Sequence, residues 1–188
     1  MKVFETKLSG VVIIEPRVFG DSRGYFMETW NQSNYAQAGL NTSFVQDNLS
    51  FSSRRVLRGL HFQNPNGQGK LVYVLQGEVF DVAVDIRAGS PTFGQWTSVI
   101  LSDRNHRQLY IPVGFAHGFC VISETALFAY KCTDLYNPGA EGGIKWDDPD
   151  IGIDWPISTP ILSEKDSVYP KLGDIPIERL PQFGGLLK

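Results

Sequence analysis

Residues 70–87 read KLVYVLQGEVFDVAVDIR, two runs rich in β-branched and aromatic residues that are joined by a Gln-Gly turn. Short runs of this kind, bounded by turn-forming residues, predict β-strands. The pattern returns in QWTSVILS (95–102), RQLYIP (107–112), HGFCVIS (117–123) and TALFAYKC (125–132). Long amphipathic helices do not alternate with these runs, so the sequence predicts an all-β sandwich or barrel.

The rest of the chain is expected to cover this β-core. The stretches NQSNYAQAG (31–39) and LSEKDSV (162–168) predict two short peripheral helices. A length of 188 residues fits one domain, 1–188, in which an irregular, proline-rich arm of about residues 137–188 packs on the core. GVVIIEP (10–16) and FVQDNLSFS (44–52) are expected to be edge strands, and such strands can pair with a partner subunit.

Composition limits the function. The net charge is −3 and like charges do not cluster, which argues against a nucleic-acid or membrane-surface partner. The N-terminal apolar run is too short for a signal peptide or a membrane span, so a cytoplasmic protein is expected. Cys120 and Cys132 lie in apolar strand segments and are expected to be free, buried thiols.

Ionisable residues stand inside several of the predicted strands. On neighbouring strands of a sandwich, His61, Lys70, Asp81, His117 and Tyr130 can meet on the inner face. Asp81 points to the same side of its strand as Val79 and Ala83. If that side is the inner face, the buried carboxylate needs a cationic or donor partner, for which a histidine is the obvious candidate. From alternation alone, a solvent-facing carboxylate is about equally expected at this position.

The sequence lacks the residues that several other kinds of chemistry require. The residue two after His61 is Gln63, so a histidine-rich metal site cannot be assembled and no metal is expected. The chain has no Gly-x-Ser-x-Gly nucleophile elbow and no glycine-rich phosphate loop that leads into a helix. Acid–base chemistry by histidine, carboxylate and tyrosine remains, and a histidine titrates near neutral pH.

Seven blocks of the sequence together resemble the dTDP-4-dehydrorhamnose 3,5-epimerase family. They occur in the family's order between about Phe19 and Asp166. The blocks are FGDSRGYFMETW (19–30), FVQDNLSFSSRRVLRGLHFQ (44–63), KLVYVLQGEVFDVAVDIR (70–87), SPTFGQW (90–96), YIPVGFAHGF (110–119), YKCTDLYNPGAEGGIKWDDPDIGIDWP (130–156) and LSEKD (162–166).

The resemblance implies a cupin-like jelly-roll β-sandwich that forms a homodimer and uses no metal or cofactor. It implies that His61 is the base that removes protons beside the 4-keto group and that Tyr130 returns a proton from the opposite face. Lys70 would stabilise the keto oxygen, and Asp81 and Asp166 would be carboxylates around the base. Inversion needs an acid that faces the base across the ring, which explains why two residues are required.

The resemblance also implies the residues that hold the nucleotide. Arg23 and Arg58 suit the diphosphate because a guanidinium donates paired, charge-assisted hydrogen bonds, and Tyr136 would stack on the thymine. Arg23 lies in the N-terminal part of the chain, before the predicted core strands, and is a candidate to reach the partner's site. The other implied substrate-binding residues are Phe19, Glu28, Gln46, Asn48, Lys70, His117, Glu141 and Lys165.

The sequence therefore predicts a cofactor-free isomerase that converts dTDP-4-dehydro-6-deoxy-D-glucose to dTDP-4-dehydro-L-rhamnose in dTDP-rhamnose biosynthesis. A relative that inverts only carbon 3 or only carbon 5 is the main alternative. A metal-dependent cupin oxygenase and a non-catalytic sugar-binding cupin are weaker alternatives, since the proposed base and acid are both present.

Overall fold

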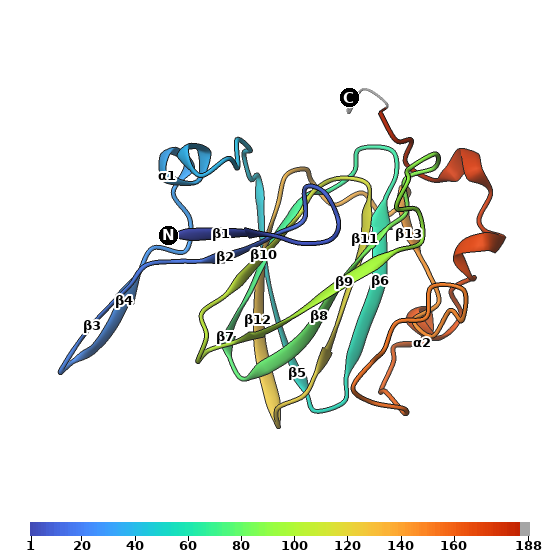
Figure 1. The fold of residues 1–188 in the computed structure, drawn as a ribbon. Coiled ribbons are helices and arrows are strands. Elements are labelled where there is room, and N and C mark those ends of the chain that lie inside the picture. The colour runs from blue at the N-terminus through green and yellow to red at the C-terminus, as the bar shows by residue number, and fades with distance from the viewer. Residues whose placement is uncertain (185–188) are drawn as a thin grey trace.

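Two antiparallel sheets face each other in the computed structural model, which describes residues 1–184 (Figure 1). The larger sheet has the order β1-β2-β10-β7-β12-β5 and the smaller one has the order β13-β6-β11-β8-β9. The predicted all-β, cupin-like jelly-roll sandwich with short peripheral helices is confirmed. The last four residues of the predicted 1–188 domain lie outside the described residues.

The strands of the larger sheet are β1 (Lys2–Glu5), β2 (Val12–Glu15), β5 (Gln46–Ser53), β7 (Lys70–Gln76), β10 (Gln108–Ile111) and β12 (Thr125–Cys132). The strands of the smaller sheet are β6 (Leu57–Gln63), β8 (Glu78–Asp85), β9 (Trp96–Ser102), β11 (Phe115–Val121) and β13 (Glu141–Gly143). All six strands predicted from the runs between residues 70 and 132 are therefore confirmed.

The edges of the larger sheet differ in part from the prediction. β5 is an edge strand, as expected. The expectation that residues 10–16 form an edge strand is wrong, because β1 pairs with the outer side of β2 and covers it. β1 begins at Lys2, too near the start of the chain for its short pattern to stand out as a strand.

A separate two-stranded hairpin, β3 (Val18–Asp21) and β4 (Gly24–Met27), stands away from the sandwich (Figure 1). Its side chains are largely exposed, and they include the large apolar residues Phe19, Tyr25 and Phe26. The two predicted helices are present as α1 (Gln32–Gln37), which ends before Gly39 at φ +96°, and α2 (Glu164–Ser167).

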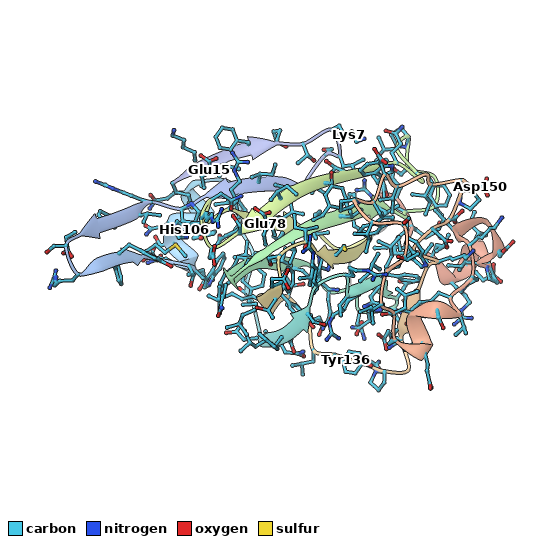
Figure 2. All side chains as sticks on the ribbon, turned by 90° about the horizontal axis from the view of Figure 1, so that it is seen from below. Lys7, Glu15, Glu78, His106, Tyr136 and Asp150 are labelled. Atoms are coloured by element: carbon cyan, nitrogen blue, oxygen red, sulfur yellow. The ribbon has the colours of Figure 1, made fainter. Side chains whose placement is uncertain are left out.

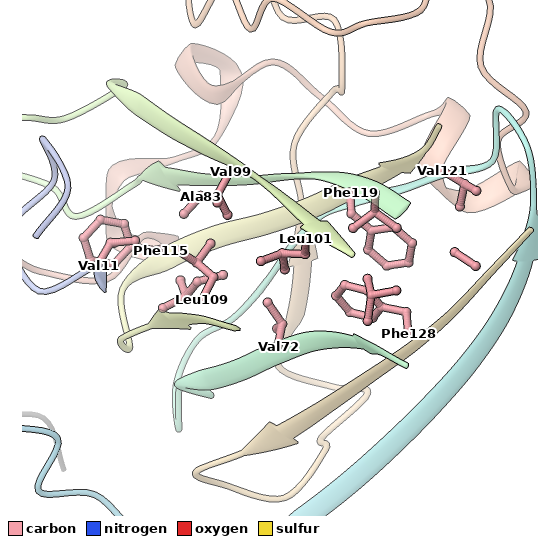
Figure 3. Packing of buried hydrophobic residues seen from close by; sticks show 14 of the residues in the cluster. Val11, Val72, Ala83, Val99, Leu101, Leu109, Phe115, Phe119, Val121 and Phe128 are labelled. Atoms are coloured by element: carbon pink, nitrogen blue, oxygen red, sulfur yellow. The ribbon is translucent and has the colours of Figure 1, made fainter. Parts of the chain in front are cut away.

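Three groups of buried apolar side chains hold these elements together. The first fills the space between the sheets, where Phe119 and Phe128 stack with ring centroids 4.1 Å apart (Figure 3). The second joins the outer face of the smaller sheet to the arm after β13, which contributes Ile144 and Leu172. The arm also contains two 3₁₀ helices, η1 (Leu172–Asp174) and η2 (Ile177–Arg179). The third group packs α1 against β2 through Tyr35.

The structure decides between the two faces that alternation left open for Asp81. Val79 and Ala83 of β8 belong to the core between the sheets, whereas Val82 and Val84 pack under the arm. Asp81 shares the parity of the first pair and therefore points between the sheets. Cys120 and Cys132 are buried and free, as expected.

Candidate active site

Two histidines lie side by side where β6 and β11 approach closely. His61 and His117 are partners in this ladder, and the register shifts before the next pair, Arg58 and Phe119. Gly59 has φ +121°, and a Cβ there would come within 2.6 Å of the Gly118 Cα. Residues opposite each other in a ladder share a face, so this irregular strand turns both Arg58 and His61 toward the inside.

His61 is paired with a carboxylate from the C-terminal arm. Its Nε2 lies 2.6 Å from Oδ1 of Asp166, whose side chain is 5 % exposed, while that of His61 is 29 % exposed. Burial acts to raise the pKa of Asp166, but hydrogen bonds and the charge of His61 hold this pKa below its usual value. A carboxylate can only accept, so neutral His61 carries its proton on Nε2 and leaves Nδ1 as a free base.

Ser163 helps to position the Asp166 carboxylate. The Ser163 side chain caps α2 by accepting a hydrogen bond of 3.1 Å from the backbone N–H of Asp166. An N-cap fixes the start of a helix, and here the capped residue is itself the partner of the base. The Ser-Glu-Lys-Asp order is a helix-start signal, which agrees with the short helix expected within residues 162–168.

The second histidine forms a different pair. Nε2 of His117 lies 3.0 Å from both carboxylate oxygens of Asp81, on the adjacent strand β8. The side chains are 8 % and 0 % exposed. Burial raises the pKa of Asp81 and lowers the pKa of His117, because both charged forms lose their hydration. The expected histidine partner of Asp81 is thus His117 and not the proposed base.

Lys70 and Tyr130 lie on the facing sheet. Tyr130 on β12 is opposite Val72 of β7 and Asn48 of β5, and the Lys70 Nζ lies 5.9 Å from the centre of the tyrosine ring. Burial raises the pKa of Tyr130, so the phenol keeps its proton at neutral pH. Burial lowers the pKa of Lys70, and nearby acidic groups, including Asp81, act against this.

The polar side chains of β5 continue the same inner surface. Gln46 donates to Asn48 over 3.0 Å and accepts from the backbone N–H of Tyr136 over 2.8 Å. Arg58 reaches across from β6 and donates through Nε to Ser52 over 3.0 Å. The sequence did not reveal this contact of Ser52, because nothing local indicates that it holds an arginine of the other sheet.

Tyr136, Glu141 and Lys165 form a linked group beside His61. The Tyr136 hydroxyl donates to Glu141 over 2.8 Å, and Lys165 Nζ lies 2.6 Å from the other oxygen of Glu141. Tyr136 is 52 % exposed, so its ring face is free to contact a ligand. Three predicted binding residues from β13, α2 and the preceding loop are thereby brought together.

Phe19, Arg23 and Glu28 are not brought to this site within one chain. Phe19 and Arg23 belong to the projecting hairpin (Figures 1 and 2), where Arg23 pairs with Asp21. Glu28 accepts hydrogen bonds from Asn31 and Asn34 at the start of α1. These three predicted binding residues stay away from His61 and its neighbours in the described chain.

Tyr169 is a further residue that the sequence did not reveal. Its ring lies edge-on to that of His61, with centroids 5.8 Å apart, and a Cβ at Gly143 would collide with it. On the outer side of β13, Tyr169 also lines a cavity of about 190 Å³ together with Phe62, Gly142 and Arg179. Tyr169 therefore forms the wall between that cavity and the proposed base.

Neither a metal-binding cluster nor a membrane-spanning helix occurs in the described part of the chain. Among residues 1–184, no three histidine, cysteine or acidic side chains gather in a way that could hold a metal ion. No helix in the described part of the chain is long and apolar enough to cross a membrane.

Comparison with known proteins gives consistent results. A family profile described as dTDP-4-dehydrorhamnose 3,5-epimerase matches residues 5–174. Enzymes of that name from Methanothermobacter thermautotrophicus and Salmonella typhimurium are 54 % and 57 % identical, over 94 % and 92 % of this chain and 97 % and 96 % of theirs. A crystal structure of the dTDP-6-deoxy-D-glucose-3,5-epimerase from Legionella pneumophila with dTDP-4-keto-L-rhamnose is 53 % identical. It superposes with a TM-score of 0.94, covering 97 % of this chain and 98 % of that one.

Proposed function

The chain belongs to the dTDP-4-dehydrorhamnose 3,5-epimerase family, and from this premise we propose how its residues carry out the reaction. The protein is an isomerase that inverts carbons 3 and 5 of dTDP-4-dehydro-6-deoxy-D-glucose and yields dTDP-4-dehydro-L-rhamnose. The observation that carries the residue assignment is that His61, paired with Asp166, and Tyr130 belong to opposite sheets of the sandwich.

In the proposed mechanism, His61 Nδ1 takes a proton from the carbon beside the keto group, and the electron pair of the C–H bond moves to form an enolate. Asp166 holds the imidazole in place and stabilises the imidazolium that forms. Lys70 donates to the enolate oxygen, where negative charge develops. Tyr130 then gives its proton to the same carbon from the opposite face, which inverts that carbon.

Each inversion moves one proton from the sugar to His61 and one from Tyr130 to the sugar. Exchange with water restores both residues before the second carbon reacts. The raised pKa of Tyr130 suits this role, because the phenol is protonated at neutral pH and is acidic enough only for a strong base such as an enolate. No step requires an oxidant or a reductant.

The variant Tyr130→Phe, assayed in deuterated water, tests this assignment. The variant should lose inverted product but still take up deuterium, because His61 can remove a proton and return a deuteron to the same face. Mass spectrometry and NMR measure the label at carbons 3 and 5. Tyr73→Phe is the matched control, since Tyr73 lies on the neighbouring strand β7, opposite Ala129 and so on the other face.

Inversion of both carbons at the wild-type rate would show that Tyr130 is only a packed aromatic residue. A folded variant with no exchange would assign it to enolate formation instead. In the wild-type protein, label at both carbons is expected, and label at only one would select the single-carbon epimerase that the sequence left as an alternative.

For the nucleotide, we propose that Arg58 contacts the diphosphate and that Tyr136 stacks on the thymine. Ser52 anchors the Nε of Arg58, which leaves the terminal guanidinium nitrogens to donate to phosphate oxygens. Glu141 and Lys165 fix the Tyr136 hydroxyl and so orient the ring. Gln46, Asn48 and His117 complete the inner wall on the side of the substrate.

We also propose a homodimer, in which Phe19, Arg23 and Glu28 serve the site of the partner. The projecting hairpin exposes four large apolar residues, and the edge strand β5 exposes Leu49 and Phe51. Exposed apolar strands of this kind favour association with a second chain. The cytoplasm is the proposed location, because both cysteines are buried and free and need no oxidising environment.

A further inference from the structure

Tyr169 contacts the proposed base but has no part in the mechanism above. Its ring meets the His61 ring edge-on, with an interplanar angle of 71° and centroids 5.8 Å apart. Aromatic pairs favour this arrangement. Among the described residues, Tyr169 is the one aromatic side chain in ring contact with His61, and Asp166 is the one side chain hydrogen-bonded to it. Two residues of the arm therefore contact the same imidazole.

The missing side chain of Gly143 makes room for this contact. Gly143 is the ladder partner of His61 on the edge strand β13, so a side chain there would stand beside the imidazole on the same face. A Cβ at this position would lie 2.3 Å from atoms of the Tyr169 ring. The Tyr169 ring therefore occupies the place of the missing cross-strand neighbour of His61.

One short segment of the arm supplies both contacts to the imidazole. Asp166 lies in α2, and Tyr169 follows two residues after this helix ends. Next to Tyr169, the carbonyl of Pro170 accepts a hydrogen bond of 2.8 Å from the backbone N–H of Lys145, just beyond β13, which fixes the segment to the sheet. Burial raises the pKa of Tyr169, although the charge of Lys165 acts against this. The ring therefore meets His61 as a neutral phenol.

We propose that Tyr169 is a positioning residue that holds the plane of the His61 imidazole, an inference that rests on the proposed function. The hydrogen bond to Asp166 restrains Nε2, but the ring can still rock about the line from Cβ to Nε2, and this motion redirects Nδ1. The edge-on contact with Tyr169 opposes that motion. Proton transfer depends steeply on geometry, so a loosely held base removes protons more slowly even when the substrate is bound.

The test compares Tyr169→Leu, which removes the ring, with Tyr169→Phe, which keeps the ring and removes only the hydroxyl. Single-turnover uptake of deuterium from solvent measures the proton-transfer step apart from product release. Tyr169→Leu should lower this rate and kcat by about 5- to 10-fold, as expected when one edge-on aromatic contact is lost. The KM for dTDP-4-dehydro-6-deoxy-D-glucose should stay within about 2-fold of the wild type, because the contact is made to the base and not to the substrate. Tyr169→Phe should match the wild type.

Gly143→Ala moves the same ring from the other strand, because its methyl group would collide with Tyr169. The backbone of Gly143 lies outside the positive-φ range that favours glycine, so alanine adds no backbone strain. This variant should also lower kcat and leave KM little changed, and it carries the test if Tyr169→Leu does not fold. The double variant should lose no more than the larger of the two single losses, since both changes act through one contact. Additive losses would contradict the proposal.

Phe62→Leu is the matched control, because it removes a ring from the same cavity without touching the contact. Phe62 lines the cavity with Tyr169 and follows His61 on β6, but its side chain packs on the outer face of the sheet. It should keep the wild-type kcat. A loss equal to that of Tyr169→Leu would mean that any loosening of this sheet edge slows the enzyme, and the proposal would fall.

Three results for Tyr169 itself would overturn the inference. The first is an unchanged exchange rate in Tyr169→Leu. The second is a rise in KM alone, since Tyr169 would then serve binding. The third is an equal loss in Tyr169→Phe, since the hydroxyl and not the ring would then act. If the wild type exchanges no proton at either carbon, the proposed function fails and the inference with it; if the wild type exchanges and Tyr169→Leu equals it, only the inference fails.

Discussion

The molecule contains two histidine–aspartate pairs on neighbouring strands, and their surroundings differ. His61 is 29 % exposed and binds Asp166 from the arm, whereas His117 is 8 % exposed and binds Asp81 from the next strand of the same sheet. The pKa of Asp166 is lowered and that of Asp81 is raised. The surroundings of Asp166 therefore favour its charged carboxylate, whereas burial disfavours the charged carboxylate of Asp81.

This difference explains why one pair suits catalysis. His61 has a free Nδ1 and enough exposure to meet a substrate, and its ionised carboxylate stabilises the imidazolium that proton transfer creates. His117 stacks on Phe128 at 6.2 Å and is enclosed by the core, where a new charge is unfavourable. We infer that His117 contacts the substrate as a neutral ring and that Asp81 fixes its orientation.

The largest expected effect is on the first pair. His61→Ala should lower epimerisation and solvent exchange at both carbons by about 10²–10⁴-fold, the usual contribution of a general base. Binding of dTDP, measured by calorimetry, should persist because Arg58 and Tyr136 remain. His106→Ala is the control: this third histidine lies beside Tyr25, near the hairpin, and should keep full exchange activity. Exchange within a few-fold of the wild type in His61→Ala would remove His61 from the mechanism.

A smaller loss is expected when only the carboxylate of this pair is changed. Asp166→Asn keeps the shape but removes the charge that stabilises the imidazolium, and the amide can also present a donor to Nε2. We expect kcat to fall about 10- to 100-fold, the range seen when the orienting partner of a functional histidine is lost. Single-turnover exchange measures the effect on the proton-transfer step itself.

Asp150→Asn is the isosteric control on the same arm, because Asp150 is exposed and takes part in neither histidine–aspartate pair. It should leave kcat unchanged. If both asparagine variants were equally active, the His61–Asp166 contact would be a structural link between the arm and β6, and the comparison of the two pairs would lose its catalytic meaning.

The fold was predictable because it depends on local patterns. The six strand runs, the parity of Asp81 and the stop at Gly39 follow from alternation and from backbone conformations that favour glycine. The isolation of the β3–β4 hairpin was not predictable, since its short alternating run looks the same whether it packs on its own chain or on another. β1 was missed because four residues near the start of the chain give too little pattern.

The site was predictable only in part, and mainly through the family resemblance. The motif residues indicate His61, Tyr130 and Asp166, but not which aspartate belongs to which histidine. That pairing depends on contacts between β6 and an arm about 100 residues later in the chain, which local patterns do not encode. Ser52 and Tyr169 contact predicted site residues from other elements, and their own sequence neighbourhood gives no sign of these contacts.

The last prediction concerns the second pair and is the smallest in energy. Because the pKa of folded His117 is lowered, the unfolded chain takes up a proton first when the pH falls through the ordinary value of 6.5. His117 therefore contributes stability above pH 6.5 and loses it as the pH falls toward the lowered folded value. The slope is at most about 1.4 kcal/mol per pH unit for one such group.

His117→Gln isolates this term, because glutamine can still donate to Asp81 but does not titrate. Urea unfolding between pH 7.5 and 5.5 should show that the free energy of unfolding falls more steeply in the wild type than in the variant. Asp81 acts in the opposite direction: its raised pKa lets the folded state bind a proton first, but only once the pH has fallen to that value. Asp81 is present in both proteins, so the difference between their curves reports the titration of His117, which starts in the unfolded chain as the pH falls through 6.5. His106→Gln should keep the wild-type slope, and parallel curves for wild type and His117→Gln would show that burial does not keep His117 neutral.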